Sequence, residues 1–188
     1  MRRFCGIAKS ARDLHLFWRD QFSYDVALKN FDCNNYLCPD MAHFLWPLNV
    51  HGNGSKTMFL MRQDQERGAV PDWVQKEQSR FIDWRDLIPI AHRQMPRMIK
   101  GLDIAGDLAR IGVPSLDLWA AHSWMLMRRM TRIFADYELV VTSRLHAHIF
   151  ACLMKRRSLI IDNCYGKNSR YFNLWTRETG LGELADNK

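Results

Sequence analysis

The sequence lacks the features that carry a chain into or across a membrane. None of its 188 residues lies in an uncharged apolar run approaching the ~20 residues that a membrane helix needs. The chain starts Met-Arg-Arg, but no apolar stretch with a small-residue cleavage site follows, so no signal peptide is expected. We therefore expect a cytoplasmic protein.

Cysteine is sparse and irregularly placed. The five cysteines are an odd number with no regular spacing, which favours free thiols in a reducing compartment over a disulfide framework. Cys33 and Cys38 could begin a zinc site, but no second close Cys/His pair follows them. We expect no metal and no bound cofactor.

The sequence also contains no internal repeat and no Gly-x-Gly-x-x-Gly fingerprint, so a dinucleotide is disfavoured. What is present is enough apolar material for a sizeable core, at 47% hydrophobic residues. Lys and Arg exceed Asp and Glu by 27 − 20 = 7. Such an excess suits polyanions, membrane surfaces or small anionic substrates, or simply makes a basic surface.

The first fifty residues resemble the end of a larger unit. Residues 11–30 are predicted to form a helix, Asn34-Asn35 to break the chain, and residues 36–38 to form a short strand stopped by Pro39. One helix and one short strand cannot close a core of their own. We interpret residues 1–50 as the remnant of an N-terminal Rossmann-like domain, with the polar segment 49–55 as a linker.

Residues 51–188 alternate between strand and helix patterns. Short apolar runs predict strands, and apolar residues at helical spacing predict helices, with residues 72–87 unassigned. The predicted strands are 57–61, 138–142 and 158–161; the predicted helices are 95–109, broken by Pro96, Gly101 and Gly106, 116–137, with Asp117 as N-cap, 144–155 and 169–178. Short connections imply a parallel sheet covered by helices. The fold class is therefore α/β, with a Rossmann-like C-terminal domain.

Polar residues follow three of the predicted strands. Arg62 follows the first, Arg144 and His146 the second, and Asn163 and Lys167 the third. Because parallel strands end along one edge of a sheet, these groups could converge on one crevice. Arginine forks hold phosphate or carboxylate, and a histidine moves protons near neutral pH. Thr142 or Ser143 could cap the helix that follows, leaving other N–H groups for an anion.

Each of these signals also has a simpler interpretation. Arg62 has Asp64 and Glu66 as ready ion-pair partners, and a histidine at a helix start is more often structural than catalytic. His146 and His148 would face one way on a strand and bind a metal, but on a helix they diverge. The basic clusters 128–129 and 155–157 lack interleaved exposed aromatics or a known motif, so we expect no nucleic-acid partner.

Residues 140–149 and 159–169, followed by Asn-Leu-Trp-Thr at 173–176, closely resemble the polysaccharide pyruvyl transferase family, in particular its bacterial exopolysaccharide members. Residues 61–66 are similar to an Arg-x-Asp-x-Glu segment of that family. Residues 11–13 and 38–42 are similar to its Ala-Arg-Asp and Pro-Asp-Met-Ala landmarks. These landmarks occur in family order over nearly the whole chain.

The resemblance implies one half of a two-domain architecture like that of glycosyltransferase-B enzymes. It implies transfer of pyruvyl from phosphoenolpyruvate to a sugar or lipid-linked oligosaccharide, usually as a cyclic ketal, with a peripheral place at the inner membrane face as one option. His146 would be the catalytic histidine, and Arg62 and Arg144 donor-binding arginines. Phosphoenolpyruvate carries a phosphate and a carboxylate, which agrees with the anion crevice inferred from the residues.

Two departures from the family pattern affect the expected activity. Residues 155–158 replace a Gly-x-Pro turn, and most of an N-terminal half is missing before Arg12. The missing half, as a separate chain, is an expected partner, and the chain alone is expected to bind phosphoenolpyruvate weakly or not to turn it over. A non-catalytic anion-binding or assembly module and a nucleotide-sugar glycosyltransferase remain the alternative functions.

Overall fold

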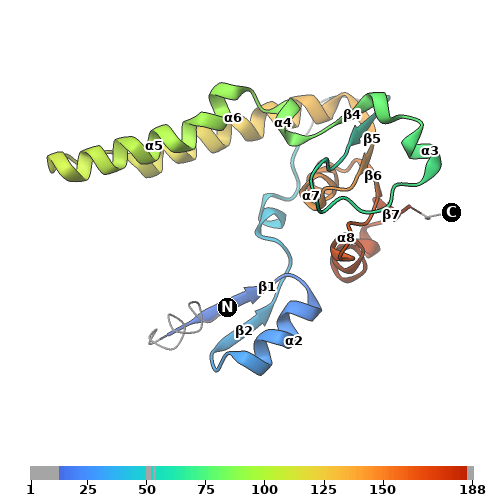
Figure 1. Cartoon of the computed structure of the whole chain (residues 1–188), viewed down its shortest axis with the longest axis horizontal. Helices are drawn as coiled ribbons and strands as arrows, with labels where there is room; N and C mark the ends of the chain where they lie inside the picture. The colour runs from blue at the N-terminus through green and yellow to red at the C-terminus, as the bar shows by residue number, and fades with distance from the viewer. Residues whose placement is uncertain (1–12, 50–51, 53, 186–188) are drawn as a thin grey trace.

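The computed structural model describes residues 13–49, 52 and 54–185, and its larger sheet has five parallel strands (Figure 1). The strand order is β4-β3-β5-β6-β7, with every neighbouring pair parallel. The strands are β3 (Lys56–Leu60), β4 (Phe81–Ile82), β5 (Tyr137–Thr142), β6 (Arg157–Ile160) and β7 (Gly182–Leu184). The Rossmann-like α/β fold class is confirmed.

Alternating side chains of the central strands build one core on each face of the sheet. Met58, Leu60 and Val140 pack on one face with Phe134 and Ala147 from helices. On the other face, Phe59, Met61, Val141 and Ile161 pack with Val74. Successive residues of a strand point to opposite faces of the sheet. A strand that is buried on both faces is therefore apolar at every position and does not alternate between apolar and polar residues. Continuous apolar runs at β3 and β5 follow from this double burial.

Helices alternate with these strands along the chain. They are α3 (Asp72–Gln75), α4 (Trp84–Leu87), α5 (Ile90–Ala109), α6 (Ser115–Ala135), α7 (Leu145–Leu153) and α8 (Lys167–Tyr171), with a 3-10 turn at Gln78–Arg80. The three predicted strands agree with β3, β5 and β6 to within one residue at each end. The unassigned segment 72–87 contains α3, β4 and α4.

Helix α5 is continuous, so the predicted breaks at Pro96, Gly101 and Gly106 are wrong. It packs along α6, and the two helices form a long hairpin that projects from the sheet (Figure 1). A Cβ on Gly106 would lie 2.5 Å from the side chain of Val113, so the glycine allows the turn between the helices to close tightly. Packing between the helices overrides the weak helix propensity of these residues.

Helix α6 begins after Pro114, and Asp117 lies in its first turn instead of at the predicted N-cap. An acidic side chain in that turn still interacts favourably with the helix dipole. The predicted terminal helix 169–178 is only partly correct. It consists of α8, a π-helical turn Phe172–Thr176 and a 3-10 turn Arg177–Thr179, and it leads into the unpredicted edge strand β7.

The N-terminal segment contains a strand where the sequence predicted a helix. The strand β1 (His15–Trp18) precedes α2 (Gln21–Asn30) and pairs in parallel with β2 (Asn34–Leu37). Asp20 caps α2 by accepting from Ser23 N at 2.9 Å, and this cap marks the change from strand to helix. Asn34 and Asn35 belong to β2, so the break predicted there is wrong.

Two predictions concern residues that the structure does not describe. The family landmark at Ala11 and Arg12 lies before the first described residue. Residues 50, 51 and 53 of the predicted linker also lie outside the described residues. The domain boundary at residue 50 therefore stays a prediction. Within the described part of the chain, no helix is both long enough and apolar enough to span a bilayer.

Candidate active site

The ends of the three central strands deliver polar residues to one cavity. Arg62, Arg144 and Asn163 follow β3, β5 and β6, which are neighbours in the sheet. The cavity has a volume of about 160 Å³. It is lined by Arg19, Arg62, Trp84, Ser143, Arg144, Leu145, His146, Asn163, Lys167 and Asn168. All five residues predicted from sequence for this site therefore meet at one place.

Hydrogen bonds join the segments that follow β3, β5 and β6. Ser143 Oγ accepts from Arg62 N at 2.8 Å, which joins the segments after β3 and β5. Asn168 Nδ2 donates to Ser143 O at 3.0 Å and to Ile161 O at 2.9 Å, which joins β5 to β6. Because the two bonds of Asn168 are buried, they fix the segments that carry the lining side chains.

Neither Thr142 nor Ser143 caps α7, which corrects the sequence prediction. Arg144 occupies the N-cap position without a capping side-chain bond. Thr142 Oγ1 donates to Leu60 O at 2.6 Å and accepts from Arg144 N at 2.9 Å. Both hydroxyls link strands because a buried hydroxyl is best satisfied by neighbouring backbone groups. The N-terminal residues of α7, Leu145 and His146, line the cavity.

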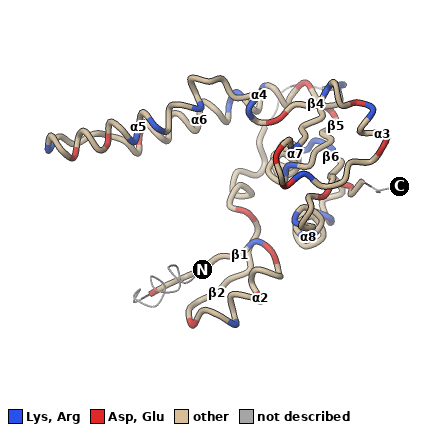
Figure 2. Tube along the Cα trace, viewed as in Figure 1, with Lys and Arg blue, Asp and Glu red and all other residues tan. Residues whose placement is uncertain are grey.

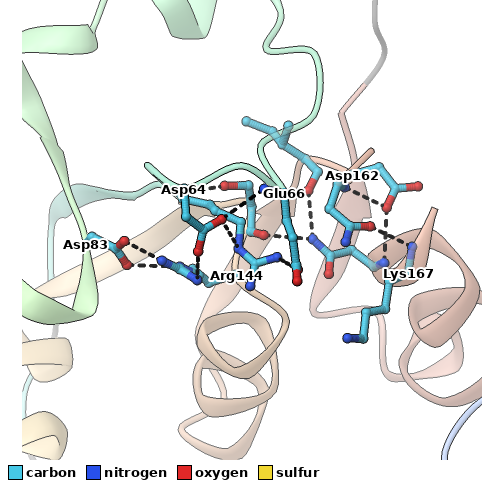
Figure 3. A network of polar contacts seen from close by, with 11 residues as sticks. Asp64, Glu66, Asp83, Arg144, Asp162 and Lys167 are labelled. Carbon is cyan, nitrogen blue, oxygen red and sulfur yellow. Dashed lines mark hydrogen bonds and ion pairs between the residues drawn. The ribbon is translucent and has the colours of Figure 1, made fainter. Parts of the chain in front are cut away.

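Arg144 lies between two carboxylates (Figure 3). Its Nε donates to Asp83 Oδ1 at 2.9 Å, its Nη2 also contacts Asp83, and its Nη1 donates to Asp64 Oδ2 at 3.1 Å. Burial works to lower the pKa of Arg144, but Asp83 and Asp64 outweigh it and raise the pKa. Asp83 also caps α4, so the arginine is anchored to a helix start.

Arg62 makes the ion pairs that its sequence neighbours suggested. Its Nε lies 3.2 Å from Asp64 Oδ1, and its Nη1 contacts Glu66. Asp64 therefore bridges the two arginines. Arg62 combines this local pairing with a place in the cavity wall, so the two interpretations of the residue are compatible.

His146 lines the cavity and lies beside a carboxylate from the N-terminal segment. Its Nε2 is 3.4 Å from Asp40 Oδ2, and its side chain is 60% exposed, so a ligand can reach it. Asp40 also accepts from Arg19 Nη1 at 2.8 Å. Burial raises the pKa of Asp40, but bonds from Ala42 N–H and Arg19, together with His146, hold it below its ordinary value. Asp40 is therefore an ionised group that contacts both Arg19 and His146.

The lining residues carry an excess of positive charge. Arg19, Arg62, Arg144 and Lys167 all line the cavity, and none of the ten lining residues, all within the described ranges, is acidic. No ion pair involving the Lys167 ammonium occurs among the residues that the structure describes, and none is drawn to it in Figure 3. The carboxylates that pair with the three arginines are not among the lining residues. The arrangement is therefore suited to a small anion with more than one negative group.

His148 points away from His146, as expected for a helix. It is fully buried, with its ring nitrogens 2.7 Å from Ser158 Oγ and 2.7 Å from Thr176 Oγ1. In the described part of the chain, no group of three His, Cys, Asp or Glu residues is placed to hold a metal ion. His148 is a structural residue that ties α7 to β6 and to the C-terminal segment.

Sequence analysis missed Arg19, Asp40 and Asp83 as site residues. Asp40 belongs to the Pro-Asp-Met-Ala landmark, which is the one signal that could have pointed to it. Arg19 and Asp83 carry no local signal. They reach the site because Trp175 Nε1 donates to Arg19 O at 2.8 Å and because α4 starts beside Arg144. These are contacts between segments that are distant in sequence.

We expect Gly68→Ala to destabilise the loop that carries Arg62. A Cβ on Gly68 would lie 2.4 Å from Asp162 O, so backbone must move, at a cost of about 1–3 kcal/mol. Gly101→Ala in α5 is the matched control. Nothing lies within 4 Å of its Cβ position, and alanine should add about 0.5–1 kcal/mol. Urea unfolding followed by circular dichroism measures both. Equal stabilities of the two variants would contradict the close approach at Gly68.

We expect stability to fall between pH 6.5 and 4 because of His148. Burial, with a smaller effect of His43, lowers the pKa of His148 to about 4. An unfolded histidine titrates near pKa ~6.5, so the unfolded chain binds a proton in this window that the folded chain excludes. The free energy of unfolding should therefore be highest above pH ~6.5 and lose on the order of 3 kcal/mol by pH 4.

Urea midpoints across this pH range test the contribution of His148. His148→Gln should flatten the pH dependence, although it lowers stability at neutral pH by disturbing two buried hydroxyl partners. His146→Gln, an exposed substitution on the same helix, is the matched control for the change of side chain. If His148→Gln and the parent protein show the same slope, another group is responsible.

The fold and site together define an α/β Rossmann-like protein with a cavity lined by cationic side chains at the carboxyl ends of its strands. Comparison with known proteins identifies the family. A sequence model of the polysaccharide pyruvyl transferase family matches residues 2–165, so the chain belongs to this family. The resemblance recognised in the sequence is thereby confirmed.

Two proteins of Bacillus subtilis (strain 168) are similar to this chain. One is EpsO, whose name describes it as a pyruvyl transferase, at 30% identity over 178 residues, covering 93% of this chain and 54% of EpsO. The other is general stress protein 30, at 26% identity, covering 89% of this chain and 44% of that protein. The chain therefore spans about half the length of these relatives.

A solved structure supports the fold. The crystal structure of a functionally uncharacterised protein from Klebsiella pneumoniae matches with a TM-score of 0.53 at 16% identity. The match covers 97% of this chain and 59% of the other. At this level of identity the similarity concerns the fold alone.

Proposed function

We propose that this protein takes part in transferring the pyruvyl group of phosphoenolpyruvate to a sugar during exopolysaccharide biosynthesis in the cytoplasm. The observation that carries the proposal is the small cavity at the strand ends, where four cationic side chains meet without an acidic lining residue. Phosphoenolpyruvate matches this cavity because it bears a phosphate and a carboxylate. Family membership supports the same conclusion.

The two arginines keep donors for a ligand despite their ion pairs. Arg144 uses three N–H groups on Asp83 and Asp64, which leaves 5 − 3 = 2 of its guanidinium N–H groups. Arg62 lines the same cavity and shares Asp64 with Arg144. We assign the guanidinium group of one arginine to the carboxylate of phosphoenolpyruvate and that of the other arginine to its phosphate. The side chains of Lys167 and Asn163 complete the phosphate contacts.

The chemistry needs an acid and charge stabilisation. Protonation of the methylene carbon makes C2 electrophilic, and a sugar hydroxyl oxygen bonds to C2 as it loses its proton. The C2–O bond to phosphate then breaks, and a second hydroxyl of the same sugar attacks C2 and loses its proton to complete the ketal. The products are the pyruvyl ketal and inorganic phosphate. Cations at the phosphate stabilise its departure.

His146 is the candidate acid because it is accessible and lies beside Asp40. Asp40 can stabilise the protonated imidazole and hold the ring toward the cavity. The alternative role for His146 is binding of the donor phosphate. A variant that loses turnover but retains donor binding supports the acid role.

A second cavity next to the first could hold the acceptor sugar. A second cavity of about 440 Å³ shares Arg19 and Lys167 with the first. Phe17 and Trp18 line it together with the polar side chains of Asp20 and Ser23. Aromatic faces beside hydrogen-bonding groups suit a sugar ring, so we place the acceptor there.

Calorimetry and a phosphate assay test the function. The chain should bind phosphoenolpyruvate weakly, and phosphate release should need an N-terminal half supplied as a separate chain or joined to this one, because the chain spans about half of its relatives. Tighter binding of a nucleoside-diphosphate sugar would favour a glycosyltransferase. Donor binding without phosphate release in the completed protein would favour a binding or assembly module.

A further inference from the structure

The hairpin of α5 and α6 exposes more apolar surface than its own packing requires. Within it, Ile99, Met130 and Phe134 are buried, and the stacked rings of His92 and His122, 5.4 Å between centroids, join the helices. Large apolar side chains remain exposed along its outside: Met98, Leu102, Ile104, Leu108, Ile111, Leu116, Leu118, Trp119, Trp124 and Met125. Exposed fractions reach 83% at Leu108 and 82% at Leu116. A surface of this kind indicates an interaction site.

This apolar surface is separate from the candidate active site. The side of α6 that faces the domain contributes Leu126, Met127 and Met130 to an apolar cavity of about 300 Å³ that reaches His146. Trp119 and Trp124 do not line this cavity and are 47% and 60% exposed. The outward side therefore has no role in the site described above.

Charge is divided along the hairpin. Its outer part, residues 101–118, carries Asp103, Asp107 and Asp117 against a single Arg110. Its inner part, residues 90–100 and 119–135, carries no acidic residue and six basic ones: Arg93, Arg97, Lys100, Arg128, Arg129 and Arg132. Figure 2 shows the acidic positions toward the free end and the basic ones toward the sheet. All of these side chains are exposed.

We propose that the hairpin pairs antiparallel with the hairpin of a second copy of this chain. A two-fold axis across the pair places the acidic outer part of each copy on the basic inner part of the other, whereas parallel pairing places like charges together. The helices have 20 and 21 residues, so each is about 30 Å long. Over this length the outer part of one hairpin can lie along the inner part of the other. The tryptophans and leucines of both copies become the core of a four-helix bundle.

Crossed charge reversal tests this pairing. The outer variant is Asp103→Lys, Asp107→Lys and Asp117→Lys; the inner variant is Arg97→Glu, Lys100→Glu and Arg128→Glu. Sedimentation equilibrium of the parent chain should show a dimer. Each variant alone should dimerise at least about tenfold more weakly, since three ion pairs per side become repulsive. An equimolar mixture should form the heterodimer, because each reversed surface then meets its complement.

Native mass spectrometry distinguishes the heterodimer by mass, and circular dichroism checks that both variants remain helical. The proposal is overturned if the parent chain is a monomer at all concentrations or if the mixture associates no better than the separate variants. It is also overturned if the parent chain is a monomer that sediments with anionic vesicles, since the same apolar and basic surface would then serve a membrane. Trp124→Ser gives an independent check, because it should weaken the dimer without removing a charge.

Discussion

His146→Gln should reduce phosphate release from phosphoenolpyruvate by about 10²–10⁴-fold, the range typical of a lost general acid. The measurement uses the completed protein with its sugar acceptor. Glutamine preserves hydrogen bonding but carries no transferable proton. The side chain is 60% exposed and lies 3.4 Å from Asp40 with no buried bond of its own, so the fold should be unaffected. Donor affinity should stay within about threefold, because Arg62, Arg144 and Lys167 remain in place.

The size of this loss decides the role of His146. A reduction below tenfold with weakened donor binding would assign it to holding phosphate instead of moving a proton. Asp40→Asn is the companion variant, since it removes the carboxylate beside His146 while keeping its size. We expect a smaller loss of turnover there, because Asp40 is not itself the proposed proton donor and contacts His146 and Arg19.

Arg144→Ala should abolish measurable binding of phosphoenolpyruvate and also destabilise the protein. Asp83 is only 7% exposed, and its carboxylate accepts two bonds from Arg144. Removing the guanidinium leaves this charge buried with only the backbone of the α4 cap, at a cost of about 3 kcal/mol. Calorimetry with phosphoenolpyruvate and urea unfolding measure the two effects separately.

A double-mutant cycle separates the binding role of Arg144 from its structural role. Arg144→Ala combined with Asp83→Asn should recover part of the lost stability, because no uncompensated charge remains, while donor binding stays absent. Arg144→Lys keeps the charge but not the planar fork, so it should fold well and bind more weakly than the parent. Undiminished donor binding by Arg144→Ala would remove this residue from the site.

Much of the site could be predicted because it follows from strand order. Arg62, Arg144 and Asn163 each come directly after a buried strand, and β3, β5 and β6 are adjacent and parallel. Such strands end along one edge whatever the rest of the chain does. His146 and Lys167 lie within a few residues of those ends. Local sequence therefore sufficed to bring these residues together.

The N-terminal contribution could not be predicted in this way. Arg19 and Asp40 reach His146 through contacts with the C-terminal segment: Trp175 bonds to Arg19 O, and the hydroxyl of Tyr171 accepts from Asp40 N. These pairs are separated by 156 and 131 positions in the chain. The Pro-Asp-Met-Ala landmark marks Asp40, but no periodicity in either segment shows which distant residues it contacts.

The same division holds for the fold. Sequence alone determined the buried strands, because side chains that are covered on both faces of a sheet must be continuously apolar, and it determined the family through the residues that follow those strands. Tertiary structure decided that Pro96 and two glycines lie within one unbroken helix, since α6 packs along it. It also decided that residues 15–18 form a strand, since only pairing with β2 stabilises an extended segment of four residues.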